Sequence, residues 1–189
     1  MNWRKIFKPS AKLSVFTLLA GGAVFGAVAF YAGQTTLHAT STDEFCMTCH
    51  SNHSLQDEVL ASVHGDNESG IVVNCRDCHL PREPFAYLQK KIAVSPDLWR
   101  FFTTEGFNTQ AHLEEHRLEW AALTHDYLRS IDSSTCRACH ARVEDDPPPE
   151  NLSRMAAGMH AMNISRDPED RQTCIDCHTG VAHPYPDEA

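Results

Sequence analysis

The sequence has no cysteine to spare. All eight cysteines fall in four copies of the pattern Cys-x-x-Cys-His, which read CMTCH, CRDCH, CRACH and CIDCH. None is left for a separate disulfide framework or for a lone reactive thiol. The sequence therefore argues against both a disulfide-stapled scaffold and a thiol enzyme.

Large apolar residues are scarce after residue 35, and positive charge is in deficit. The formal net charge of the 189-residue chain is −9, whereas a nucleic-acid-binding domain needs a basic face. The length allows one ordinary domain, or a small domain with an anchor. Because such a chain buries little apolar surface by itself, we expect another component to complete its core.

The one long uncharged run lies at residues 13–31. As a helix it would span roughly 28 Å, about the thickness of the hydrocarbon core of a bilayer. Four basic residues precede the run, and residues 34–44 after it contain no lysine or arginine. The positive-inside rule therefore places the N-terminus in the cytoplasm and the rest of the chain outside, in the periplasm of a bacterium.

Two alternatives stay open for this run. The Ala-Val-Ala at 27–29 fits a signal-peptide cleavage site, although signal peptides usually have a shorter apolar run of about 7–15 residues. Gly22 and Gly26 form a GxxxG pattern, through which two membrane helices could approach and form a homo-oligomer. The expected organisation is a cytoplasmic basic N-terminus (1–12), a transmembrane anchor (13–33) and a periplasmic domain (34–189).

The four motifs need one explanation for two cysteines and a histidine. Paired Cys-x-x-Cys units can build a zinc site, but zinc leaves the histidine after every second cysteine unexplained. Covalent haem explains all three positions, because two thiols attach one porphyrin and the histidine ligates its iron. The thioether positions are then Cys46, Cys49, Cys75, Cys78, Cys136, Cys139, Cys174 and Cys177, and the first axial ligands are His50, His79, His140 and His178.

Four haem c groups would supply the missing core. Because the polypeptide would wrap cofactor rather than itself, we expect a mainly α chain with many loops and little sheet. The fold class is thus one N-terminal transmembrane helix followed by a multihaem domain.

The second axial ligands decide whether each iron only transfers electrons or also binds a molecule. His160 lies 14 residues before Cys174, which is enough chain to cover the far face of the fourth haem. His183 lies only five residues after His178, so we expect it to serve another haem. His64 could serve the second haem or a neighbour. Three candidates for four positions leave one haem short, and we expect this to be the first haem.

Other histidines are weaker candidates. His53 is three residues from His50, so the two compete for one face of the first iron and cannot easily take opposite faces. Residues 108–130 predict one helix, with Asn108 as its N-cap and an apolar stripe at helical spacing. Packing is the simpler role for the three histidines of this helix, which are His112, His116 and His125.

The chain resembles the NapC/NirT family of membrane-anchored tetrahaem quinol dehydrogenases. Besides the four motifs, stretches such as TLHATSTDEFC (36–46), GFNTQA (106–111) and GVAHPYP (180–186) carry the resemblance. It implies an inner-membrane protein that oxidises menaquinol or ubiquinol. It also implies that electrons pass through four haems to periplasmic acceptors, which are soluble cytochromes or terminal reductases of anaerobic respiration.

The resemblance also implies a ligand set. The first haem would be high-spin and nearest the quinone, and the others low-spin with two histidines each. It assigns His183 to the second haem, His64 to the third and His160 to the fourth. Some relatives ligate the first haem through a methionine two positions after the motif histidine, but Asn52 stands there. His50 is then the default ligand, with His53 as a competitor.

Residues 84–102 mix aromatic and basic side chains, which suits the headgroup level of a bilayer. The alternative is an ordinary amphipathic helix on a soluble core. The resemblance places a lysine and an aspartate of this segment at the quinone site, and they match Lys91 (preferred) or Lys90, and Asp97. An ammonium could stabilise the developing quinolate, and a carboxylate could accept a proton.

Two rival functions remain. The open first haem could reduce a small substrate such as nitrite, although no further catalytic cluster stands out. The chain could instead be the dedicated haem subunit of a nitrite reductase or another terminal reductase. The acidic segment 141–150 is either a docking element for such partners or a solvated surface turn.

Overall fold

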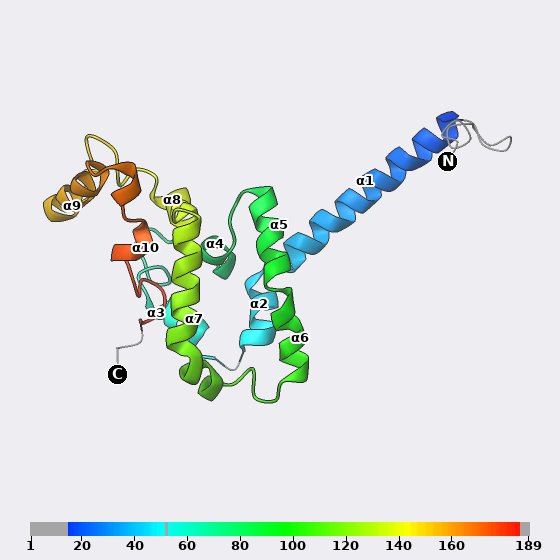
Figure 1. The fold of residues 1–189 in the computed structure, drawn as a ribbon, viewed down its shortest axis with the longest axis horizontal. Coiled ribbons are helices and arrows are strands. Elements are labelled where there is room, and N and C mark those ends of the chain that lie inside the picture. Colours follow the sequence, from blue (N-terminus) through cyan, green and yellow to red (C-terminus); the bar gives the residue numbers. More distant parts are fainter. Residues whose placement is uncertain (1–14, 52, 186–189) are drawn as a thin grey trace.

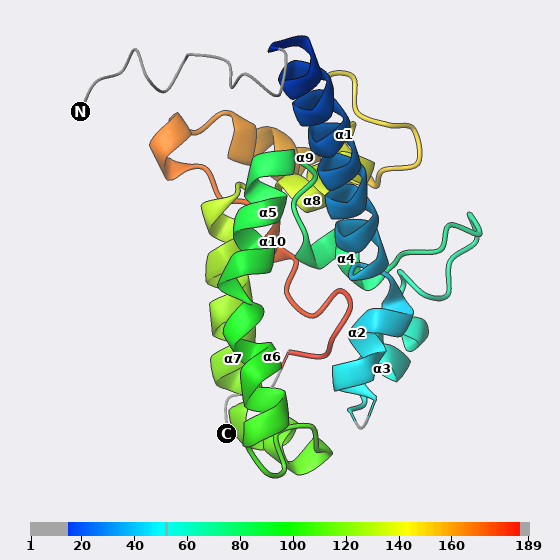
Figure 2. The same cartoon turned by 90° about the vertical axis from the view of Figure 1, so that its right-hand side faces the viewer.

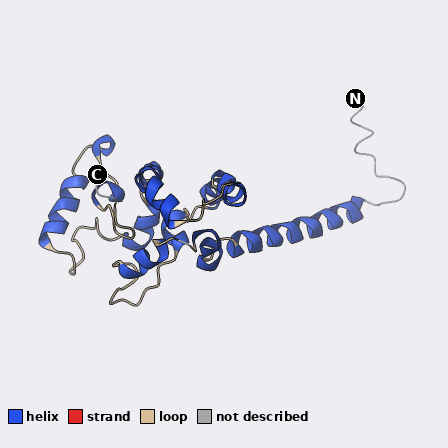
Figure 3. Cartoon of the chain, turned by 90° about the horizontal axis from the view of Figure 1, so that it is seen from below, coloured by secondary structure: helices blue, strands red, loops and turns tan. Residues whose placement is uncertain are grey.

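A computed structural model of the chain describes residues 15–51 and 53–185 (Figure 1). The basic residues before the apolar run and Asn52 lie outside the described residues. Throughout the described part the secondary structure is helical, and Figure 3 shows helices and loops there without a strand. The helices are α1 (Val15–Ala39), α2 (Asp43–His50), α3 (Leu55–Ala61), α4 (Cys75–His79), α5 (Pro84–Ala93), α6 (Ser95–Thr103), α7 (Gln110–Ser130), α8 (Ser134–His140), α9 (Arg154–Ile164), the 3₁₀ turn η2 (Pro168–Asp170) and α10 (Cys174–Cys177).

Helix α1 projects away from the rest of the chain as a single rod (Figure 1). Within it, Thr17–Ala39 is long and apolar enough to cross a membrane. The helix continues past the expected end of the anchor at residue 33, and the threonine hydroxyls there find acceptors on the preceding turn. Thr36 and Thr40 each donate to the carbonyl four residues earlier, at 2.9 Å. The apolar side chains of α1 are exposed, as befits a helix that faces lipid.

Each Cys-x-x-Cys-His motif forms a short helix, and local caps explain where these helices begin. The Asp77 carboxylate accepts from the backbone N–H of Asn74 at 2.9 Å, just before α4. The Asp176 carboxylate likewise accepts from the backbone N–H of Thr173 at 2.7 Å, before α10. In both cases an acidic residue three positions after the cap satisfies a backbone donor that the helix leaves free. A helical start also puts the two cysteines of a motif, at i and i+3, on one side.

Helix α7 runs through the middle of the soluble part, between α5–α6 and the segments around α9 and α10 (Figures 1 and 2). The expected helix at 108–130 is therefore present, but its N-cap is Thr109, so the expectation of Asn108 is wrong by one residue. Thr109 has extended backbone angles, and its Oγ1 accepts from the backbone N–H of His112 at 3.3 Å. At the other end, Ser133 takes a left-handed conformation and turns the chain into α8.

The segment at 84–102 contains two helices, α5 and α6, rather than one. Pro84 begins α5, where the missing N–H costs nothing. Pro96 stands in the first turn of α6, and in the interior of a longer helix it would remove a hydrogen bond and clash with the preceding turn. The break at Val94 separates the basic residues of α5 from Asp97 of α6.

The apolar core is very small. Among the described residues, the buried hydrophobic side chains are Leu113, Leu128 and Ile175. Two of these lie on α7 and one on α10, and these two helices are in contact. This agrees with the expectation that the polypeptide alone does not complete its core.

Candidate functional site

The four motif helices lie in a row, in the order of the sequence. Helix α2 contacts α4, and α4 contacts α8. The Ser133 hydroxyl before α8 accepts from the backbone N–H of Ile175 in α10 at 3.4 Å. The cysteines meet at the same junctions, since Cys46 neighbours Cys75 and Cys136 neighbours Cys174. The row begins beside the end of α1 and extends away from it toward α9 (Figure 1).

Three motif histidines each face a histidine from elsewhere in the chain. The ring centres are 6.4 Å apart for His79 and His183, 6.2 Å for His64 and His140, and 6.1 Å for His160 and His178. A metal lies about 2 Å from each imidazole nitrogen that ligates it, so two imidazoles on opposite sides of one metal have ring centres roughly 6 Å apart. The separations in all three pairs match that geometry.

The outer histidine of each pair is held by a hydrogen bond from its Nδ1. His64 donates to the Val181 carbonyl at 3.1 Å, and His160 to the Val143 carbonyl at 3.2 Å. His183 donates to the Glu58 carboxylate at 3.2 Å. An N–H at Nδ1 leaves the lone pair on Nε2, which is the usual arrangement of a histidine that ligates a metal.

The first motif lacks such a facing pair. His50 instead lies beside His53, three residues away, with ring centres 5.4 Å apart and their Nδ1 atoms 3.3 Å apart. His53 is buried, and its Nε2 has no hydrogen-bond partner. Burial lowers the pKa of both imidazoles, and for His53 the neighbouring His50 and His112 lower it further.

Lys91 lies where α5 meets the end of α1. Its ammonium donates to the carbonyl of Thr40, and its Nζ is 5.8 Å from the ring centres of both Phe45 and Tyr87. Burial lowers the pKa of Lys91, and Phe45 directly precedes Cys46 of the first motif. The ammonium is therefore close to the first motif and to the membrane helix.

Lys90 points elsewhere. Its Nζ lies 3.5 Å from the ring centre of Tyr127 on α7, so the two neighbouring lysines face different parts of the molecule. Asp97 on α6 pairs with Arg100 at 2.7 Å, and both side chains are more than half exposed. Burial lowers the pKa of His50, and the nearby Asp97 carboxylate opposes this shift. Asp97 is thus an acidic group of α6 that lies close enough to influence His50 of the first motif.

Helices α5 and α6 expose large apolar side chains next to this position. Phe85, Ile92, Trp99 and Phe102 are each more than three-fifths exposed. Tyr87 fastens α5 to α1, because its hydroxyl donates to the Leu37 carbonyl at 2.9 Å and also contacts the Ser41 hydroxyl. Exposed aromatics at the end of a membrane-spanning helix fit the interfacial region of a bilayer.

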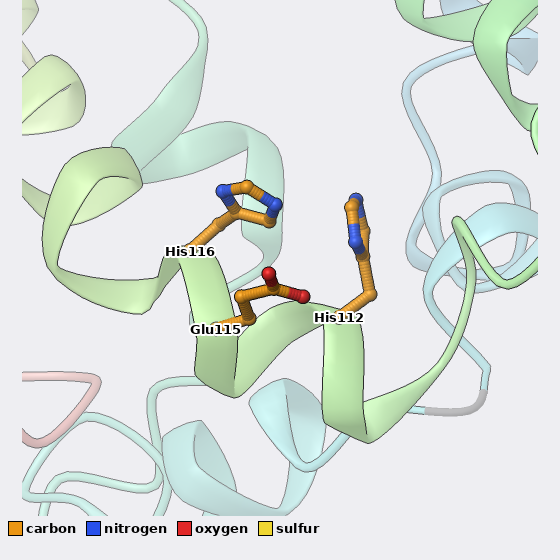
Figure 4. A group of neighbouring side chains, drawn as sticks. All are labelled: His112, Glu115 and His116. Carbon is orange, nitrogen blue, oxygen red and sulfur yellow. The ribbon is translucent and has the colours of Figure 1, made fainter.

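A further histidine cluster lies on α7. Figure 4 shows His112, Glu115 and His116 on one face of the helix, and their nearest ligand atoms lie within 4.8 Å of one another. His116 stacks on Trp120 with ring centres 5.4 Å apart, and Phe107 lies 5.4 Å from His112. These contacts fit the packing role expected for the histidines of this helix.

The described residues fit four covalently attached haems. The motif helices place thiol pairs and histidines together, three histidine pairs have the separation of axial ligands, and the polypeptide buries few large side chains of its own. An apolar macrocycle at each motif would supply buried apolar contacts, of which the described chain has few of its own.

Comparison with known proteins defines the class as c-type cytochromes with one apolar N-terminal helix. Residues 8–188 match the profile described as "NapC/NirT cytochrome c family, N-terminal region", so the chain belongs to the NapC/NirT family. This confirms the resemblance found in the sequence, and with it the mainly helical fold class and the four covalent haem c groups.

Individual relatives cover most of the chain. The sequence is 57% identical to the tetraheme c-type cytochrome CymA of Shewanella oneidensis MR-1, over 98% of this chain and 99% of that protein. It is 35% identical to the cytochrome c-type protein NapC of Paracoccus pantotrophus, over 98% of this chain and 76% of that protein. It is 34% identical to the cytochrome c-type protein TorC of Escherichia coli K12, of which it spans 46%.

One solved structure, the cytochrome c nitrite reductase NrfHA complex bound to the inhibitor HQNO, contains a similar chain. The likeness covers 82% of this chain and 97% of that chain, at 22% identity and a TM-score of 0.41. A likeness this slight carries no argument about the site.

Sequence reasoning missed Glu58 and Tyr87. Glu58 forms a nearly buried ion pair with Arg117, at 2.6 Å, and contacts His183, which is 125 residues away in the chain. Burial alone would raise the pKa of Glu58, but hydrogen bonds from Arg117 and Ser54 and the charge of Arg117 outweigh it and hold the pKa at about 2. No local pattern marks such residues, because their partners lie in distant segments.

Proposed function

We propose that the chain is a membrane-anchored quinol dehydrogenase. It oxidises menaquinol or ubiquinol at the membrane and delivers the electrons to acceptors in the periplasm. When bound, haem c supplies the one-electron carriers that this requires. The observation that carries the proposal is the row of motif helices that leads outward from the end of α1, with three facing histidine pairs and a first motif without one.

The anchor is α1, with the N-terminus in the cytoplasm and the haem domain in the periplasm. The distribution of lysine and arginine around the apolar run supports this orientation. Association of two copies through Gly22 and Gly26 stays a prediction. An added Cβ at either glycine would meet no atom of this chain within 4 Å, so the face is open.

The quinol binds where α1, α2 and α5 meet. Lys91 turns from the Thr40 carbonyl to hydrogen-bond a quinol oxygen, and its positive charge stabilises the quinolate as the proton leaves. Asp97 accepts a proton and, being more than half exposed, passes it to the surrounding water. The overall change releases two protons and two electrons for each quinol converted to quinone.

The axial ligands are the ones that the family resemblance implies. His79 and His183 serve the second haem, His140 and His64 the third, and His178 and His160 the fourth. The matching ring separations and the Nδ1 hydrogen bonds of the outer histidines support this assignment. His50 serves the first haem alone, with His53 as its competitor.

The proposal is tested with the full-length protein, carrying its haems, in liposomes. Menaquinol and ubiquinol analogues are offered to the oxidised protein and the haem absorbance is followed, and in a second experiment nitrite is offered to the reduced protein. We expect rapid reduction by at least one quinol and no rapid reoxidation by nitrite. Failure of both quinols to reduce the haems would refute a quinol dehydrogenase, and fast reoxidation by nitrite would favour a terminal reductase.

A further inference from the structure

The three outer histidines have different hydrogen-bond acceptors. His64 and His160 donate to backbone carbonyls, whereas His183 donates to a carboxylate, that of Glu58. A carbonyl is neutral, but an ionised carboxylate places a full negative charge beside the imidazole. The haem that uses His183 is therefore in a different electrostatic environment from the other two.

The Glu58 carboxylate is held firmly in place. Arg117 donates to both of its oxygens, from Nη2 to Oε1 at 2.6 Å and from Nη1 to Oε2 at 3.2 Å. The Ser54 hydroxyl also donates to Oε1, at 2.5 Å. The side chains of Glu58 and Arg117 are only 13% and 14% exposed, so water screens this cluster little. The oxygen that faces His183 is therefore fixed in direction.

Arg117 does not cancel the charge of Glu58 fully. Its Nε also donates to the Glu114 carboxylate at 3.0 Å, and its Nη2 to the other oxygen of Glu114 at 3.1 Å. One guanidinium is thus shared between two carboxylates, and the cluster keeps a net negative charge. A carboxylate that accepts from the N–H of a ligating histidine makes the other ring nitrogen more basic, and this nitrogen then donates more electron density to the metal.

The cluster also positions a loop. His183 stands in irregular chain after α10, whereas His160 lies within α9. Glu58 comes from α3 and Arg117 from α7, and Gln110 of α7 accepts from the backbone N–H of Ser54 at 2.8 Å. The His183 ring is thus held by two helices that lie far from it in the sequence. A loop histidine needs such a tether to keep its ring fixed.

We propose that Glu58 is a positioning residue for His183, and that it orients the ring and lowers the reduction potential of the second haem. A stronger donor favours the oxidised iron, which carries the greater positive charge, over the reduced iron. The inference rests on the assignment of His183 to the second haem. It adds that the second haem is the one whose outer histidine has a carboxylate at Nδ1, whereas His64 and His160 have backbone carbonyls there.

The test compares two variants of the full-length protein. Glu58→Gln keeps the hydrogen-bond acceptor and removes the charge. Glu114→Gln removes the second carboxylate that pairs with Arg117 and leaves the contact between Glu58 and His183 in place. Potentials are measured by redox titration of the haem absorbance, and low-temperature paramagnetic resonance counts the low-spin irons. We expect Glu58→Gln to keep its low-spin irons and to raise one potential, with a roughly tenfold change in the reduction equilibrium, about 59 mV for one electron.

Further variants separate an effect of Glu58 on the reduction potential from a role that only holds the His183 ring in place. Glu114→Gln should raise that potential clearly less than Glu58→Gln does, because Glu114 is half exposed and does not face His183, although Arg117 then compensates Glu58 alone. Glu58→Ala should broaden or shift one low-spin signal, since the ring loses its acceptor. If Glu58→Gln leaves every potential at its wild-type value, the tuning role is wrong, even where thermal stability falls.

Two further measurements on the same preparations keep this inference separate from the proposed function. His183→Ala should convert one low-spin iron to high-spin. An unchanged low-spin count would overturn the ligand assignment and the role of Glu58 with it. Quinol-driven reduction of the first haem in Glu58→Gln should proceed at the wild-type rate. Its loss would place the defect at the quinol site and contradict a role confined to the second haem.

Discussion

The first haem motif and the other three differ in what faces them. His79, His140 and His178 each meet a second histidine from another segment, whereas the described histidine whose ring lies against His50 is His53, three residues away. All four motifs have the same three ligating residues, two cysteines and a histidine. In the proposed function, the difference between an electron carrier and a site that receives a substrate therefore lies in the surrounding fold and not in these three residues.

The side chains around the first motif also differ from those around the other three motifs. Near the first motif lie Lys91, Asp97 and the exposed aromatics of α5 and α6, next to the membrane helix. Around the outer motifs, imidazole nitrogens are tied to carbonyls or to a carboxylate. In the proposed function, the first motif is therefore where quinol is bound and deprotonated, and the other three motifs hold their axial histidines in fixed positions.

The largest expected effect comes from removing the facing histidine of one of the last three motifs. His160→Ala removes the imidazole that faces His178, so we expect one low-spin iron to become high-spin while all four haems stay attached. Low-temperature paramagnetic resonance measures this directly. His125→Ala is the matched control, because His125 stacks on Tyr185 and faces no motif histidine. An unchanged spectrum for His160→Ala would contradict the pairing.

The next effect concerns the binding end. Lys91→Gln removes the ammonium beside the first motif, and we expect quinol-driven reduction to slow by about 10- to 100-fold, the value of a hydrogen bond to a charged group. Stopped-flow absorbance measures the rate, and the haem content should stay that of the wild type. Lys90→Gln should slow the reaction less, because Lys90 lies against Tyr127. The reverse order of effects would move the assignment to Lys90.

A smaller effect should follow from weakening the contact between α5 and the end of α1 without changing any charged residue. Tyr87→Phe removes the hydroxyl that joins α5 to Leu37 and Ser41 at the end of α1. We expect the free energy of unfolding to fall by about 1 kcal/mol, measured by thermal unfolding in detergent. Tyr31→Phe, on the exposed face of α1, should have no measurable effect. Equal losses in both variants would show that the contact to α5 is not the cause.

The smallest expected effect tests which histidine serves the first haem. His53→Gln removes the competitor of His50 but keeps a polar group of similar size. We expect the spin states of all four irons to stay as in the wild type, because His50 is the ligand. Loss or conversion of one haem signal in this variant would assign the first haem to His53.

Much of this organisation could be predicted from the sequence, because its signals are local. Cysteines at i and i+3 followed by histidine specify covalent haem, and the uncharged run at 13–31 specifies the membrane helix. Pro96 is a local signal for the break between α5 and α6, because proline is tolerated in the first turn of a helix and not in its interior. The sequence pattern places the N-cap of α7 one residue early, at Asn108. Asn108 and Thr109 are both favourable N-cap residues, and only the backbone angles show that Thr109 is the cap.

The rest depends on contacts between distant segments. The link from Glu58 to His183 joins residues 125 positions apart, and the link from Tyr87 to Ser41 joins residues 46 apart. Neither leaves a spacing pattern. Because haem fills much of the core, the chain also lacks the alternation of apolar residues that normally reports which faces meet.

The short connection between α1 and the first motif has a consequence for how the protein meets its substrates. Only residues 40–42 separate the two helices, and Tyr87 and Lys91 tie α5 to the same junction. In the proposed function, the quinol-oxidising end is therefore held at a constant depth beside the bilayer. A lipid-soluble quinol then reaches it by lateral diffusion in the membrane, and water-soluble acceptors meet the opposite end of the row of motifs, so the two reactants use separate surfaces.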